Sequence, residues 1–315
     1  MELYIEKEFL DNFYNDFEDN KVQNIVKDIF TLYGKKRVFL NFEFDDFKIL
    51  ENENKIFSLI SNIIPPTPIN TIKDHLFNNS DFKQTLVFTN QPCDWFKDAK
   101  DKGALCFSFE NYEKKIEEII NNLHFRIDLS EKFNGWSFLK AYKVLNFNTL
   151  TLTDSYILVD TSQKKICNNL IPILKTLLLN KNNKIKVDIY TDETKPGNRS
   201  IVYFKDTAIK RHGLLKGEIA KKNVAFSLIN KEVPLLNNKI DFHDRNILTN
   251  FSILMCGKGF NLIPHKVSNS EITSETIFNK YTYNRLNNLK EQLEDYLINL
   301  KKSDYSYYFK MYPEQ

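Results

Sequence analysis

The sequence predicts an α/β protein with two units of alternating strands and helices. Its 315 residues exceed the usual size of one domain, so we expect two. Short runs rich in β-branched and aromatic residues alternate with stretches of helical apolar spacing in both halves of the chain. A hydrophobic content of 42% is enough to fill two cores. We place the units at residues 1–130 and 145–315, with the crossing at about 125–148.

Composition indicates the class of protein and its compartment. No apolar run reaches the roughly 18 residues of a membrane span, and the N-terminus lacks a basic signal region. The four cysteines are dispersed without a Cys-x-x-Cys pair, which indicates reduced thiols rather than structural zinc. Heavy use of Lys and Asn is typical of an AT-rich bacterial genome. We therefore expect a bacterial, cytoplasmic protein with no membrane partner.

The net charge of +3 conceals two regions of opposite sign. Residues 1–60 carry 13 acidic and 8 basic side chains, whereas residues 181–222 carry 11 basic and 5 acidic ones. The second stretch could attract phosphates, and a solvated lysine-rich loop explains the same charges equally well. Its candidate phosphate contacts are Lys210, Arg211, Lys221 and Lys222.

The sequence of the first unit predicts a parallel sheet. We expect strands at residues 3–5, 38–42, 86–90 and 104–109, and helices at 6–19, 22–33, 56–64, 94–101 and 110–123. Gly34 and Pro65 end two of these helices, because glycine adopts the left-handed cap and proline cannot continue a helix. The last four elements alternate strand and helix at βαβ spacing, which requires parallel strands.

The residues that follow these last two strands resemble a known pattern. Thr89-Asn90 before a helix, then the Gly103 turn, a strand and Ser108-Phe109-Glu110-Asn111 are similar to the closing half of a PIN-type nuclease domain. The resemblance covers residues 1–120 and implies a Rossmann-like unit whose carboxylates hold Mg²⁺ or Mn²⁺ at the carboxyl edge of the sheet. Gln91 stands where a further acid is expected, and solvated carboxylates are the alternative. The matching positions are Glu6, Asp45, Asp46 and Asp94.

The second unit begins with a strand at 150–160, a helix at 166–179 kinked at Pro172, and a strand at 185–190. We expect a C-terminal helix at 272–302, opened by a capping box of Ser268 and Glu271. Packing of its apolar stripe against its own unit is the expectation, and a dimer interface is the alternative. The stripe consists of Leu286, Leu289, Leu293, Tyr296 and Leu300.

The residues from Phe242 to Phe260 hold the strongest candidate site. Their apolar bursts predict two paired, buried strands, with His243 and Arg245 on one face of the first and a tight turn at Gly257–Gly259. From His243 the spacing is His-x-Arg-x4-Asn-x6-Gly. This resembles the phospholipase D-like signature His-x-Lys-x4-Asp-x6-Gly, with Arg245 for Lys and Asn250 for Asp.

The phospholipase D-like resemblance covers residues 150–263 and implies a second Rossmann-like unit. In active members one His attacks phosphorus, a second His protonates the leaving oxygen, and neighbouring side chains hold the phosphate. The resemblance thus implies catalytic roles for His243, Arg245 and Asn250. It also implies binding roles for Asp244 and for Lys258, which stands where Ser is common. Arg suits the position of Lys, because its planar fork binds two phosphate oxygens.

One signature supplies half of an active site. Either two chains pair so that both His243 residues face one phosphate, or His124, His212 or His265 supplies the second imidazole. Two alternatives remain. The site binds without catalysis, or it is structural, with an ion pair of Asp244 and Arg245 holding the strand and His243 as a buried histidine.

Two functions follow from these resemblances. The first is a bacterial effector or accessory protein acting on nucleic acid, such as a phosphodiesterase or nuclease of a phage-defence or mobile-element system, with Mg²⁺ or Mn²⁺ in the N-terminal unit. The alternative is a non-catalytic recognition subunit that binds nucleic acid or a partner protein through the same face.

Overall fold

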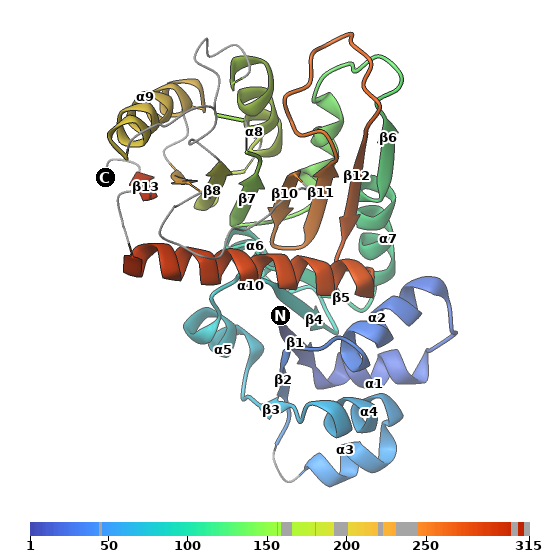
Figure 1. Ribbon diagram of the computed structural model, residues 1–315. Helices are drawn as coiled ribbons and strands as arrows, with labels where there is room; N and C mark the ends of the chain where they lie inside the picture. Colours follow the sequence, from blue (N-terminus) through green and yellow to red (C-terminus); the bar gives the residue numbers. More distant parts are fainter. Residues whose placement is uncertain are drawn as a thin grey trace. The chain divides into compact units, whose positions relative to one another are not determined.

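The chain has an α/β fold with two sheets, seen in a computed structural model (Figure 1). The structure describes residues 1–43, 46–155, 157–158, 166–179, 181–191, 201–219, 223–230, 245–303 and 308–311. The chain divides into two compact units, each assembled from separated stretches. Unit 1 comprises residues 1–122, 144–148 and 276–284, and unit 2 comprises 123–143, 149–275 and 285–315. The sequence ranges 1–130 and 145–315 did not include this return of the chain to unit 1.

Unit 1 begins with alternating strands and helices close to those expected. Its elements are β1 (Glu2–Glu6), α1 (Lys7–Asn15), α2 (Lys21–Thr31), β2 (Arg37–Asn41), α3 (Phe47–Glu53), α4 (Lys55–Ile63), β3 (Thr67–Pro68), α5 (Ile72–Asn79), β4 (Thr85–Thr89), α6 (Phe96–Asp101), β5 (Leu105–Ser108) and α7 (Tyr112–Leu123). The expected strands and helices of this region are confirmed, and α3, β3 and α5 were not anticipated.

The five described strands of unit 1 form a parallel sheet in the order β3-β2-β1-β4-β5. The strand order reverses between β1 and β4, where Ile5 pairs with Phe88. Parallel sheets of this kind bind ligands outside the carboxyl ends of the strands at such a reversal. The predicted parallel βαβ arrangement of β4, α6 and β5 is confirmed.

Both faces of the unit 1 sheet are covered, because successive side chains of each strand point to opposite sides. On one face Tyr4 and Val87 belong to an apolar cluster with Leu76 of α5 and Ala99 of α6. On the other face the Phe88 ring contacts Phe9, Phe30 and Phe107.

Unit 2 contains a larger, mixed sheet. Its elements are β6 (Phe125–Asp128), the 3-10 helix η2 (Ser137–Val144), β7 (Thr149–Thr153), the π-helical turn η3 (Ile166–Leu170), α8 (Ile171–Leu177), β8 (Ile185–Thr191), α9 (Ile201–Ile219), β9 (Val224–Asn230), β10 (Arg245–Thr249), β11 (Ser252–Cys256), β12 (Glu271–Thr276), α10 (Lys280–Ser303) and β13 (Tyr308–Met311). The last residue of η2, the last residue of β12 and the first five residues of α10 belong to unit 1. The eight described strands have the order β13-β9-β8-β7-β10-β11-β12-β6.

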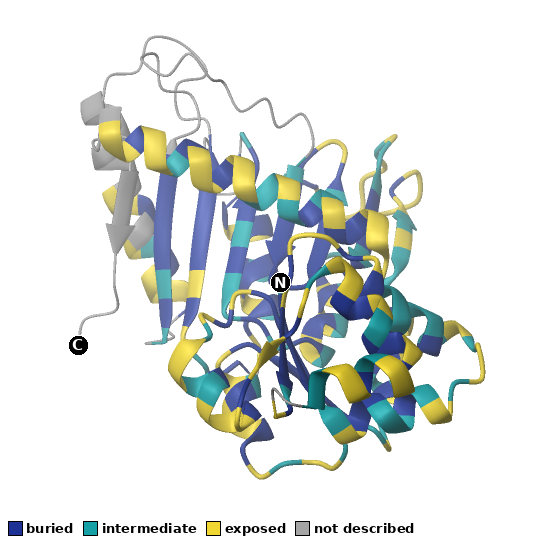
Figure 2. Cartoon of the chain, turned by 90° about the horizontal axis from the view of Figure 1, so that it is seen from below, coloured by how far each residue is buried: buried dark blue, intermediate teal, exposed yellow. Residues whose placement is uncertain are grey.

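The centre of the unit 2 sheet changes direction at β7. Strands β7, β8 and β9 are parallel, whereas β10 runs antiparallel to β7 and pairs with β11 as a hairpin. Figure 2 shows that most of the strand residues are buried, while α10 exposes one side. The Tyr190 hydroxyl of β8 donates to the Leu293 carbonyl of α10, and the Tyr190 ring contacts Tyr296. The side of α10 that carries Leu293 and Tyr296 therefore packs against its own unit.

The C-terminal helix is shorter than the sequence indicated. Residues 271–276 form β12, whose residues are alternately buried, and Glu271 forms an ion pair with Arg126 of β6. The helix begins at Lys280, where the Asn279 side chain accepts hydrogen bonds from the Tyr281 and Thr282 amides. The capping box of Ser268 and Glu271 was therefore wrong. Four of the five stripe residues are buried as expected, with Leu286 and Leu300 fully covered, whereas Leu289 is partly exposed. Among the described residues, no helix combines the length and apolarity of a membrane span.

Candidate functional site

The predicted hairpin places Arg245 at one edge of the unit 2 sheet. Arg245 begins β10 and lies opposite Cys256, the last residue of β11. Its Nη1 donates to the Gly257 carbonyl at 2.7 Å, which fixes the guanidinium against the turn after β11. Its Nε is buried and has no hydrogen-bond partner among the described residues. The side chain is half-buried, so the guanidinium is partly open to solvent.

A buried carboxylate lies beside Arg245. Asp154 directly follows β7 and is 2% exposed, and its Oδ2 accepts the Phe260 N–H at 2.8 Å. Gly259, with φ +89°, separates it from the guanidinium. A Cβ on Gly259 would lie 2.8 Å from Asp154 Oδ2 and 3.5 Å from Arg245 Nε. The predicted turn at Gly257–Gly259 is confirmed, since the Gly259 N–H donates to the Cys256 carbonyl. This turn brings the Asp154 carboxylate close to the Arg245 guanidinium.

Lys258 extends the positive charge of this edge. It is exposed at the tip of the turn, and its backbone N–H donates to Ser270 Oγ at 3.1 Å. Burial raises the pKa of the nearby Cys256 thiol to about 11, which favours the protonated thiol over the nucleophilic thiolate. We name Arg245, Lys258, Asp154 and Gly259 the Arg245 edge. Chemically, it offers an oriented guanidinium fork and an ammonium group, the donors that suit phosphate oxygens.

Asn250 does not belong to the Arg245 edge. It lies just beyond the other end of β10, five residues away, which is about 16 Å along an extended strand. The side chain is fully buried, and its Oδ1 accepts both the backbone N–H and the hydroxyl of Thr149. The structure therefore separates two residues that the resemblance assigned to one site, and Asn250 has a structural role.

The basic stretch is only partly at the surface. Lys210 of α9 is exposed, whereas the neighbouring Arg211 is 4% exposed. The assignment of Arg211 to a phosphate-facing surface was wrong, because successive helix residues lie about 100° apart and Arg211 falls on the inner side. Lys221, Lys222, His243 and Asp244 lie outside the described residues.

The acidic residues assigned to a metal in unit 1 are not gathered. Glu6 ends β1 at the reversal of strand order, where its Oε2 accepts the Asn90 backbone N–H. Asp94 is exposed before α6, Asp46 lines a separate cavity beside α3, and Asp45 is outside the described residues. In the part of the chain that the structure describes, no three His, Cys, Asp or Glu side chains are placed to hold a metal. Glu6 therefore fixes the start of the β4–α6 loop.

Two residues of the Arg245 edge were missed as site residues. Asp154 was included only within the expected strand at 150–160, and Gly259 only as a turn residue. The sequence could have indicated Asp154, because it is a carboxylate directly after an apolar strand. In a parallel sheet such a residue lies at the carboxyl edge, where ligands bind. The proximity of Asp154 to Arg245 depends on the β7–β10 pairing, which places Asn246 opposite Thr153.

Comparison with known proteins leaves the family open. No protein-family model matches the chain, and no curated protein sequence matches it.

Proposed function

We propose that the chain recognises nucleic acid, with the Arg245 edge of unit 2 binding backbone phosphates. The observation that carries this proposal is the state of Arg245. Its guanidinium is oriented by the Gly257 carbonyl through Nη1, and the side chain is partly open to solvent although Nε is buried. A pre-oriented, partly exposed guanidinium is suited to a phosphate, whose oxygens accept charge-assisted N–H bonds.

Recognition without cleavage is the form of this function that the geometry favours. The phospholipase D-like arrangement would need further side chains around the phosphate, and Asn250 is engaged with Thr149 instead. The buried Asp154 accepts the Phe260 amide and so orients the neighbouring turn. The two charged groups of the edge that reach the surface, Arg245 and Lys258, are cations suited to bind an anion.

A binding assay with a matched Arg control tests this proposal. Fluorescence anisotropy would measure the affinity for labelled single- and double-stranded DNA and RNA at low salt. We expect Arg245→Gln to weaken binding about five- to tenfold, as for loss of one charge-assisted phosphate contact. The control Arg126→Gln removes an Arg of β6 that is 74% exposed and paired with Glu271, and should bind like wild type. Absence of binding to every nucleic acid would refute the proposal.

The same samples distinguish recognition from hydrolysis. We expect the labelled strands to stay intact with Mn²⁺ and with EDTA. Cleavage that survives EDTA and is lost in His243→Ala would replace recognition with a phospholipase D-like reaction. Cleavage that requires Mn²⁺ would instead assign catalysis to the unit 1 carboxylates.

A further inference from the structure

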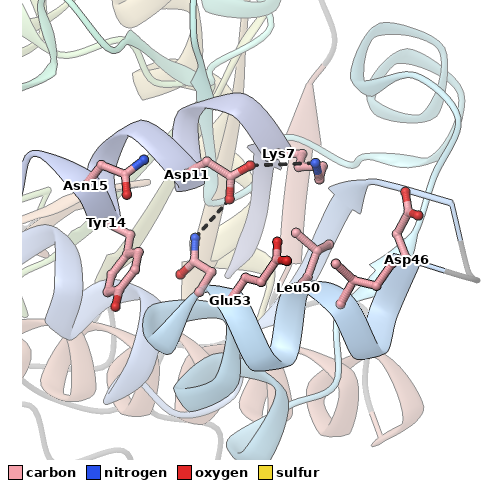
Figure 3. A pocket seen from close by; sticks show the side chains of 9 residues that line it. Lys7, Asp11, Tyr14, Asn15, Asp46, Leu50 and Glu53 are labelled. Carbon is pink, nitrogen blue, oxygen red and sulfur yellow. Dashed lines mark hydrogen bonds and ion pairs between the residues drawn. The ribbon is translucent and has the colours of Figure 1, made fainter.

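Unit 1 contains a cavity of about 330 Å³ between α1 and α3 (Figure 3). Helix α1 supplies Lys7, Asp11, Tyr14 and Asn15 to its lining. Helix α3 and its flanking residues supply Asp46, Ile49, Leu50, Glu53 and Asn54. The cavity is thus framed by two helices and lined mainly by polar side chains, with apolar residues between them.

Hydrogen bonds fix the side of the cavity formed by Asn54 and Asp11. Asn54 is 2% exposed, and its amide donates to the Leu10 carbonyl and to Asp11 Oδ1, at 3.2 and 3.1 Å. The Asn54 Oδ1 accepts the Ile56 and Phe57 amides and so caps α4. Asp11 is also 3.7 Å from Lys7 Nζ. These bonds fix α1 against Asn54, the lining residue that directly precedes α4.

The other polar groups of the lining have no hydrogen-bond or ion-pair partner among the described residues. The side chains of Tyr14, Asn15, Asp46 and Glu53 make no hydrogen bond or ion pair with any residue that the structure describes. In Figure 3 the Asp46 and Glu53 carboxylates extend from α3 on the side that faces α1. A ligand in the cavity would therefore meet unused acceptors without displacing an internal bond.

The spacing of the charges selects the kind of ligand. Three carboxylates and one ammonium group give the lining a net charge of −2 at neutral pH. Asp46 and Glu53 lie two helical turns apart, which is about 10 Å along the axis and on nearly the same side of α3. Leu50, 4% exposed, lies between them. A divalent metal needs carboxylates that converge on one point, whereas this row suits charges at the two ends of an aliphatic chain.

We propose that the cavity binds a linear aliphatic diamine or polyamine. One ammonium group pairs with Asp46 and another with Glu53, and the methylene groups between them lie against Leu50. Tyr14 Oη and Asn15 Oδ1 accept further ammonium hydrogens. The proposal concerns unit 1 alone and does not depend on nucleic-acid binding by unit 2.

Calorimetric titration of the full chain with putrescine and spermidine tests the proposal, with n-butylamine and MgCl₂ as comparisons at matched ionic strength. We expect one diamine per chain, weaker binding of the monoamine, and no competition from Mg²⁺. Equal affinity for the monoamine, or displacement of the diamine by Mg²⁺ at equal concentration, would overturn the proposal.

Two variants locate the binding. Asp46→Asn combined with Glu53→Gln should weaken diamine binding about tenfold, through loss of two ion pairs, and should leave the melting temperature unchanged or raised. The charge-matched control combines Asp98→Asn with Glu117→Gln, two exposed carboxylates elsewhere in unit 1. Ile49→Lys, at a position 53% exposed, should abolish binding by placing a cation in the cavity. Equal weakening in the control, or wild-type affinity of Ile49→Lys, would contradict the proposed site.

Discussion

Thr149 donates both its backbone N–H and its hydroxyl to the side-chain oxygen of Asn250, each at 3.0 Å. The bonds join the first residue of β7 to the turn of the β10–β11 hairpin. Lys290 of α10 also donates to the Asn250 carbonyl, at 3.3 Å. Asn250 therefore holds together three elements of unit 2, at the end of β10 that is remote from Arg245.

Replacing Asn250 should reduce stability and spare nucleic-acid binding. Asn250→Ala removes a buried acceptor and leaves the Thr149 donors unpaired, which costs about 1–3 kcal/mol. Urea denaturation would measure the loss, with the exposed Asn269→Ala as the control of unchanged stability. A folded Asn250→Ala protein that fails to bind nucleic acid would return this residue to the functional site.

Gly259→Ala should destabilise unit 2 strongly. The residue has φ +89°, and an added methyl group would lie 2.8 Å from Asp154 Oδ2. Backbone strain and the displaced carboxylate together cost about 2–4 kcal/mol. Gly213→Ala is the control, because Gly213 lies in α9 with no atom within 4 Å of the new methyl group. It should be neutral or slightly stabilising, since Ala is the better helix former. Equal unfolding free energies for the two variants would contradict the close approach at Gly259.

Arg211 and Lys210 are neighbours, but only replacement of Arg211 should reduce stability. Arg211→Gln should lower the free energy of unfolding by about 3–5 kcal/mol. The substitution removes a buried guanidinium, and the groups that interact with it lose their partner. Lys210→Gln, at an exposed position, should change stability by less than about 0.5 kcal/mol. Thermal unfolding of both variants checks the pair. If Arg211→Gln melts like wild type, Arg211 is not a structural residue.

Lys36 should make the stability of unit 1 depend on alkaline pH. It is 5% exposed and donates to the Ile29 and Phe30 carbonyls at the end of α2. Burial lowers its pKa from 10.5 to about 8, so between these values the folded chain binds fewer protons than the unfolded chain. Stability from this group therefore rises with pH across that window.

The comparison with Lys36→Met isolates this effect. From pH 7 to pH 10, wild type should gain about 2 kcal/mol relative to Lys36→Met in urea denaturation. Lys21→Met, which removes an exposed Lys at the start of α2, should show no such gain. A difference that stays constant between the two pH values would mean that Lys36 titrates normally in the folded chain.

Local sequence patterns were sufficient for much of the fold. Strand β1 and helices α1 and α2 follow from their apolar spacing, and the βαβ spacing gave the parallel sheet. Strand β12 was mistaken for helix because Ile272 is the single apolar residue in Glu271–Thr276, so its period-two burial is hidden in the sequence. Helix α9 was not predicted, since Gly213 and Gly217 interrupt a stretch of weak helical periodicity.

The candidate site depended more on tertiary contacts. The hairpin pattern and the spacing from His243 were enough to select Arg245. Its neighbour Asp154 is about ninety residues away in the chain, and only the pairing of β7 with β10 brings them together. Arg245 and Asn250 are close in the sequence but far apart in the structure. They are five residues apart in the motif, yet the extended strand β10 places them at opposite ends.

The salt dependence of nucleic-acid binding tests the proposed function most directly. Each phosphate neutralised on duplex DNA contributes a slope of about −0.9 to the logarithm of the affinity against the logarithm of salt concentration. The slope for Arg245→Gln should be smaller in magnitude than that of wild type by about 1. Arg126→Gln should keep the wild-type slope. Identical slopes and affinities for wild type and Arg245→Gln would contradict phosphate recognition at the Arg245 edge.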